Sequence, residues 1–122
     1  MAIELSFWKY KLGEYLDNGE VYQSCCQGLS ADELEELDEE AILSALRNEF
    51  SGWECRKEGD ELIFDGGGKG HFNLFSTGQF MRMDCFEMDY EDMNTIVDVM
   101  HEFACPLYDP SLPQRFDTYI EI

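Results

Sequence analysis

The sequence predicts an α+β fold, in which an antiparallel sheet of about five strands packs against two amphipathic helices. Several segments alternate apolar and polar residues with the period of two that is typical of strands. Tight turns separate four of these segments, and two other segments carry apolar residues at helical spacing. Because the chain has 122 residues, of which 44% are hydrophobic, we expect a single domain over 1–122 with a buried core.

The N-terminal segment predicts the first strand, because apolar residues at positions 3, 5 and 7 alternate with polar ones. Residues 13–29 have no strong period and contain several glycines, so we interpret them as a loop. Ser30 and Glu33 resemble a capping box, and Asp38 offers a second N-cap. The apolar spacing that follows Asp38 predicts a helix over about 39–51.

Four further strands at short, even spacing predict an antiparallel meander. We expect them at residues 53–58, 61–65, 71–76 and 79–86. The run FDGGGKGHF lies between the second and third of these strands and predicts a hairpin turn. It differs from a phosphate-binding loop, because no Ser or Thr follows the lysine and a strand, not a helix, comes next.

The clearest helix is predicted over 89–104, with Asp89 as its N-cap and Pro106 after its end. Its apolar residues follow the i, i+3, i+4, i+7 pattern of a buried helical face. They are Met93, Ile96, Val97, Met100, Phe103 and Ala104. The proline-containing tail is expected to be irregular or to hold one short strand around 116–120.

The last meander strand has two different faces. Met81, Met83 and Cys85 form an apolar face, whereas Phe80, Arg82, Asp84 and Phe86 form a mixed one. We expect the mixed face to be partly open to solvent, so a site for a small enzyme or a metal-binding protein is one hypothesis for it. That site would consist of His71, Asn73, Arg82 and Asp84.

The negative charge is concentrated in two segments. The formal net charge is -19, and residues 30–40 and 84–102 each hold seven acidic residues and neither Lys nor Arg. A surface of this kind repels itself and attracts cationic partners, although a solvated acidic surface also aids solubility. We therefore predict a partner-binding surface made of Glu35, Glu36, Glu39, Glu40, Asp84, Glu87, Asp89, Glu91 and Asp92.

Composition argues against several classes of function. Eight Lys and Arg without a basic run argue against direct binding of nucleic acid or of an anionic membrane. No apolar run is long enough to span a membrane, and the N-terminus does not resemble a signal peptide. The five cysteines lack a CxxC pair, so we expect reduced thiols and a cytoplasmic location.

The residues show no complete catalytic or cofactor motif. His71 and His101 are the only histidines, and neither belongs to a motif with zinc-ligand spacing. Cys85 or Cys105 would form a nucleophile pair with a histidine only if the fold brought them together. The acids around Asp89 lack the spacing of an EF-hand loop. We therefore expect no cofactor, no metal and no enzymatic activity.

Four segments carry a resemblance to a known group of proteins. They are FWKYKLGEYLDNGEVYQ, LIFDGGGKGHF, QFMRMDCFEMDYEDMNTIVDVM and CPLYDPSLPQRFD. Together they resemble small acidic bacterial immunity proteins of toxin systems, including contact-dependent growth inhibition. The resemblance implies a cytosolic protein that binds and blocks a toxin domain. It implies no particular binding residues, because such proteins use different surfaces against different toxins.

The leading hypothesis is therefore an immunity protein that neutralises a basic toxin domain through its acidic surface. Toxins that cleave nucleic acid must be basic, so an acidic inhibitor would complement them. Two alternatives remain open: an enzyme or metal-binding protein that uses the mixed sheet face, and an acidic mimic of nucleic acid. The sequence specifies neither the toxin nor the oligomeric state.

Overall fold

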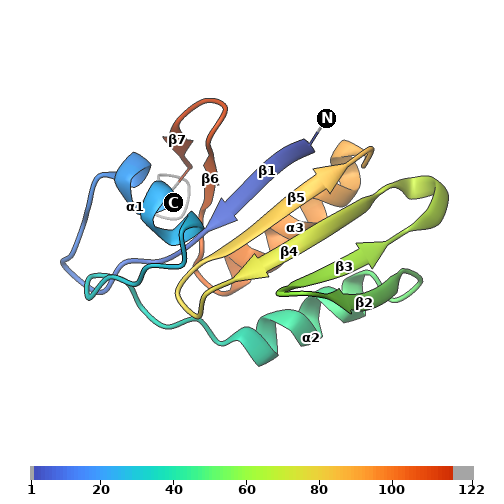
Figure 1. The fold of residues 1–122 in the computed structure, drawn as a ribbon, viewed down its shortest axis with the longest axis horizontal. Helices are drawn as coiled ribbons and strands as arrows, with labels where there is room; N and C mark the ends of the chain where they lie inside the picture. Colours follow the sequence, from blue (N-terminus) through green and yellow to red (C-terminus); the bar gives the residue numbers. More distant parts are fainter. Residues whose placement is uncertain (1, 117–122) are drawn as a thin grey trace.

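One seven-stranded antiparallel sheet organises the chain, with strand order β2-β3-β4-β5-β1-β6-β7 (Figure 1). The computed structural model describes residues 2–116. Its strands are β1 (Ala2–Phe7), β2 (Glu54–Glu58), β3 (Glu61–Asp65), β4 (His71–Ser76), β5 (Met81–Phe86), β6 (Leu107–Asp109) and β7 (Gln114–Arg115). Its helices are α1 (Asn18–Cys26), α2 (Glu39–Glu49) and α3 (Tyr90–Glu102), with a 3-10 turn η1 (Gly67–Lys69). The α+β class is confirmed, but the sheet is wider than predicted and there is a third helix.

The predicted meander is confirmed. Strands β2 to β5 pair in order, each antiparallel to the next. The glycine-rich run forms the β3–β4 connection, and Gly70 in it has a φ of +87°. A Cβ at Gly70 would collide with the backbone carbonyl of Phe86, so both the backbone angle and the space require glycine there.

Helices α2 and α3 cover one face of the sheet (Figure 1). The main core lies between them and the sheet, and β5 contributes Met81, Met83 and Cys85 to it, as its alternation predicted. From α3, Met93, Ile96 and Met100 are buried as predicted. Val97 and Phe103 are only half-buried, and Val99 is buried instead. The other large side chains that are fully buried in this core are Phe7, Ile42, Leu46, Phe64 and Phe72.

The prediction of a loop over 13–29 is wrong, because this segment contains α1. Asp17 caps the helix, and its carboxylate accepts hydrogen bonds from the backbone N–H groups of Gly19 and Glu20. Asn18 and Gly19 occupy the first turn, where backbone N–H groups have no partner within the helix and glycine is tolerated. The helix ends before Gly28, which has a φ of +83°.

Of the two predicted N-cap signals before α2, only the second starts a helix. No helix begins at Ser30, and Leu34 instead forms a β-bridge with Tyr10. Helix α2 begins at Glu39 as predicted, where Asp38 accepts a hydrogen bond from the backbone N–H of Ala41. The tail forms the short strands β6 and β7, while most of the predicted strand around 116–120 lies outside the described residues.

We predict that α3 contributes strongly to stability through its buried face. Replacing the fully buried Ile96 with Ala should lower the free energy of unfolding by about 2–5 kcal/mol, because it leaves a cavity in the core. Replacing the exposed Asp98 with Ala should change it by less than about 0.5 kcal/mol. Urea denaturation of both variants measures the difference, and equal losses would contradict the orientation of this helix.

Candidate functional site

The first acidic segment lies at the end of the sheet where β4 turns into β5. The backbone N–H of Leu37 donates to the carbonyl of Gly78 at 2.7 Å, and the hydroxyl of Ser76 donates to the carboxylate of Glu39 at 2.6 Å. The side chain of Glu39 is therefore half-buried and already has a hydrogen-bond partner. Glu35, Glu36 and Glu40 are exposed.

The second acidic segment begins at the opposite end of β5. This strand has six residues, so about 20 Å separate the β4–β5 turn from the start of α3. Glu87, Asp89 and Glu91 are exposed there, and Asp92 is half-buried. Asp89 holds the N-cap position as predicted, but its side chain makes no capping hydrogen bond. The two predicted groups of acids therefore lie at opposite ends of the layer formed by α2 and α3.

The ninth predicted residue, Asp84, lies on the other face of the sheet. Its carboxylate is 3.1 Å from Nε of Arg82, and only 18% of either side chain is exposed. The guanidinium of Arg82 also approaches the carboxylate of Glu4 at 3.7 Å and lies over the ring of Phe75. Asp84 therefore has an ionic partner inside the protein, unlike the acids at the helix starts.

The exposed acids of the two segments have no basic partner among residues 2–116. Within that range, the ion pairs with a separation of 4.0 Å or less are made by Arg56 or Arg82. Both arginines lie on the sheet face opposite α2 and α3, as the antiparallel registers show. The charge at the helix starts is therefore available to a partner.

The mixed sheet face is partly open, as its alternation predicted. A cavity of about 190 Å³ lies on it, lined by Arg56, Glu58, Ile63, Asp65, His71 and Asn73. The guanidinium of Arg56 is held at its edge by Glu58 at 2.7 Å and by Asp65 at 3.3 Å. Two residues of the hypothesised enzyme or metal site, His71 and Asn73, line the cavity, whereas Arg82 and Asp84 do not.

The charged side chains of this face pair with one another, whereas the buried Oδ1 of Asn73 has no hydrogen-bond partner. The hydroxyl of Tyr22 donates to the carboxylate of Glu4 at 2.9 Å, and burial together with this carboxylate raises the pKa of Tyr22. The ring of His71 stacks on Phe86 with 4.7 Å between centroids. Among the described residues, no three His, Cys, Asp or Glu side chains are grouped closely enough to hold a metal ion.

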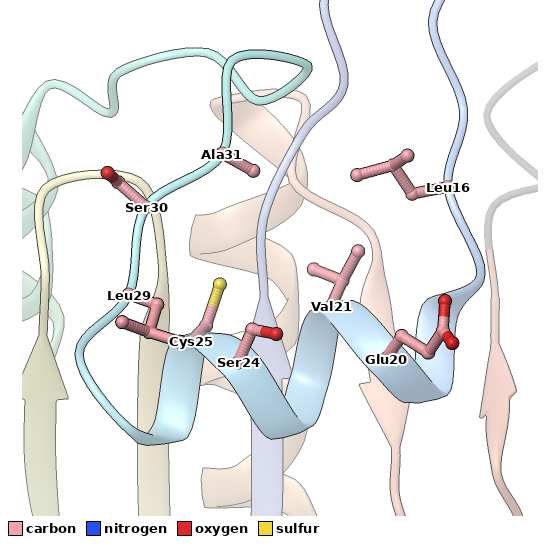
Figure 2. A pocket seen from close by; sticks show the side chains of 8 residues that line it. All are labelled: Leu16, Glu20, Val21, Ser24, Cys25, Leu29, Ser30 and Ala31. Atoms are coloured by element: carbon pink, nitrogen blue, oxygen red, sulfur yellow. The ribbon is translucent and has the colours of Figure 1, made fainter.

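Helix α1 creates a second, smaller apolar cluster on this same sheet face. Trp8, Phe80 and Tyr108 pack there against Val21 and Cys25 of the helix, and the centroid of the Trp8 ring lies 6.1 Å from that of Phe80 and 5.2 Å from that of Tyr108. Between α1 and the segment that follows it is a cavity of about 230 Å³ (Figure 2). Figure 2 shows Val21 and Cys25 pointing from the helix into this space, with Leu16 and Ala31 across it.

Gln79, which no sequence pattern singled out, holds one wall of this cavity in place. Gln79 is 8% exposed, and its amide donates to the carbonyls of Ala31 and Leu34 at 2.9 and 3.2 Å. Its side-chain oxygen accepts from the backbone N–H of Ala31 at 3.0 Å. The available signal was the position of this glutamine, between the turn Thr77–Gly78 and the apolar Phe80. A glutamine that is buried at such a position must find hydrogen-bond partners for its amide.

The five cysteines are free thiols. Cys25, Cys85 and Cys105 are buried, and burial raises the pKa of Cys25 and Cys105 to about 11 and that of Cys85 to about 12. A catalytic cysteine needs the opposite shift, because the thiolate is the nucleophile. The nucleophile pair considered for Cys85 or Cys105 therefore has no support in their surroundings.

Comparison with known proteins places the chain in no group. No family model matches the sequence, and a search of curated proteins finds no similar sequence. Among the described residues, no helix is both long enough and apolar enough to cross a membrane. The function is therefore inferred from the geometry and charge of the chain itself.

We predict that moderate salt stabilises this protein, because its exposed acids repel one another without basic neighbours. The melting temperature should rise between about 0.01 and 0.1 M NaCl, as the Debye length falls from about 30 to about 10 Å. Differential scanning calorimetry measures the change. A flat response would mean that a bound cation already neutralises the acids, and repeating the measurement with a chelator would then reveal it.

We predict that Cys55 is the fastest cysteine to react with a disulfide reagent at pH 8, because it is exposed. Cys85 and Cys105, which lie in the main core, should react only as fast as the protein opens. Above their ordinary pKa of about 9.0 the unfolded chain loses thiol protons that the folded chain keeps, so stability should fall as the pH rises towards 11–12.

Absorbance at the reagent's wavelength gives the labelling rates, and a Cys55→Ser variant is the control that removes the fast phase. Rapid labelling of Cys85 or Cys105 in folded protein would contradict the main core described above.

Proposed function

We propose that this protein is an immunity protein, which binds and neutralises a basic toxin domain in the cytosol through its acidic surface. One observation supports the proposal most directly: the exposed carboxylates at the starts of α2 and α3 have no basic partner among the described residues. Leaving these charges unpaired costs stability through self-repulsion. A basic partner recovers that free energy when it binds.

A toxin that cleaves nucleic acid is a suitable partner. Such a domain needs a positively charged surface to hold its substrate, and an acidic protein can cover the same surface. The two clusters also set a size for the contact. The 13 residues of α3 span about 20 Å, so a toxin that touches both clusters must extend along the whole helical layer. An interface of standard size, about 800 Å² for each partner, is large enough.

The mixed sheet face offers less to a competing function. Arg56 and Arg82 already contact carboxylates of the same face, so they have little capacity left for an anionic substrate. An acidic mimic of nucleic acid would use the same charges as an immunity protein. The identity of the basic partner separates these two possibilities, and a toxin gene beside this gene would favour immunity.

We predict that protection and fast association depend on the local acidic clusters. In one variant Glu35, Glu36 and Glu40 become Lys, and in a second Glu87, Asp89 and Glu91 become Lys. At low salt, reversing the cluster that contacts the toxin should slow association by about tenfold or more, because steered association is far faster than neutral association. Stopped-flow fluorescence with the neighbouring toxin domain measures the rate.

A dispersed variant provides the matched control. Reversing the exposed residues Glu14, Glu54 and Asp60, which lie outside both acidic segments, changes the net charge by the same amount. If all three variants slow association equally, the net charge and not the clusters would control it. If cells that produce the toxin die equally with and without this protein, the immunity proposal is wrong.

A further inference from the structure

We propose that the cavity between α1 and the segment that follows it is an anchor pocket for the partner. This pocket would receive one aliphatic or aromatic side chain from a basic segment of the partner. This inference rests on the proposed function and adds a contact site to it. The pocket is lined mainly by the apolar groups of Leu16, Val21, Cys25, Leu29 and Ala31. Its volume of about 230 Å³ is below the ~300–1,000 Å³ of ordinary small-molecule sites, so it suits a single side chain better than a cofactor.

The walls of the pocket are fixed in advance. The three hydrogen bonds of Gln79 hold Ala31 and Leu34 on one side. On the other side, the hydroxyl of Tyr10 donates to the carbonyl of Leu16 at 3.0 Å. A rigid pocket loses little conformational entropy when it is filled, and interface anchors are typically found in pockets of this kind.

Apolar surface around the pocket is left uncovered. Leu29 forms part of the wall, yet it is 55% exposed, and Tyr15, next to Leu16 in the chain, is 62% exposed. An inserted apolar side chain would remove much of the Leu29 surface from water. Burial of such a surface is a favourable term that charge alone does not supply.

The charge beside the pocket specifies the kind of partner. Glu20 lies at one end of the cavity and Ser30 at the other (Figure 2). Ser30 begins the acidic segment 30–40, so one carboxylate, that of Glu20, lines the pocket, and the exposed Asp32 follows directly after the lining residue Ala31 in the chain. Lys9 and Lys11 lie on the chain that pairs with this segment, but acidic residues outnumber them there. The complementary ligand is therefore an apolar side chain with basic neighbours.

The pocket can be tested without the toxin, by titrating the ¹⁵N-labelled full chain with short peptides. The probe peptide has one leucine between two pairs of lysines. A second peptide has serine in place of leucine, and a third keeps the leucine but has glutamates in place of the lysines. Amide shifts of Val21, Cys25 and Ala31 report on the pocket, and the leucine–lysine peptide should bind at least about tenfold more tightly than either of the others.

Two tryptophan variants act as a matched pair on α1. Ser24 lines the cavity, so Ser24→Trp should block the mouth and abolish the shifts, whereas Gln23→Trp on the same helix should leave them unchanged. Leu29→Ser, which changes a largely exposed side chain, should weaken binding while the rest of the spectrum stays that of the folded protein.

The outcomes separate this inference from the proposed function. Shifts in the pocket that need both leucine and lysine, and that Ser24→Trp removes, support the anchor pocket. Equal binding of the leucine and serine peptides, with shifts confined to the acidic segments, overturns the pocket but leaves the electrostatic proposal intact. Absence of shifts with every peptide, or equal binding of the glutamate peptide, also overturns the pocket. Protection from the toxin is decided separately, by the growth experiment described above.

Discussion

Strands β1 and β5 need an apolar cover over the whole of one face and over one end of the other, and this requirement organises the rest of the fold. They pair along their full lengths in the middle of the sheet, from Ala2 opposite Phe86 to Phe7 opposite Met81. On one face, Met81 and Phe7 need the apolar sides of α2 and α3. On the other face, Phe80 together with Trp8 needs a second cover, which α1 supplies only at this end of the sheet. The remainder of the second face stays open and polar.

This uneven covering explains which parts of the fold the sequence could predict. The meander is encoded locally, by alternating residues and tight turns, so its four strands were placed to within one or two residues. Helix α1 has only two buried residues, Val21 and Cys25, and therefore a weak helical pattern. Its start signal, Asp17, was present, but Asn18 and Gly19 suggested a turn. Strands β6 and β7 have three and two residues and exist only through tertiary pairing.

The candidate site shows the same division. The acids were visible in the sequence. Their separation follows from the fold, because α2 begins beside one end of β5 and α3 begins after the other end. The different role of Asp84 follows from strand alternation, which placed it beside Arg82 on the opposite face. The pocket was not predictable, because its walls come from an unrecognised helix and from a glutamine whose partners are 45 and 48 residues away in the chain.

The distribution of charge and the pocket have complementary physical roles. Charge acts over about a Debye length and depends little on orientation, so it brings together any basic protein and this one. It therefore accounts for the speed of an encounter but discriminates poorly between basic partners. A rigid pocket acts only in contact and rejects side chains that do not fill it, or that bring a polar group without a hydrogen-bond partner. In a protein with such a strong negative charge, specificity must come from contacts of the second kind. The cavity between α1 and the segment that follows it is suited to supply them, because it combines apolar walls with the carboxylate of Glu20.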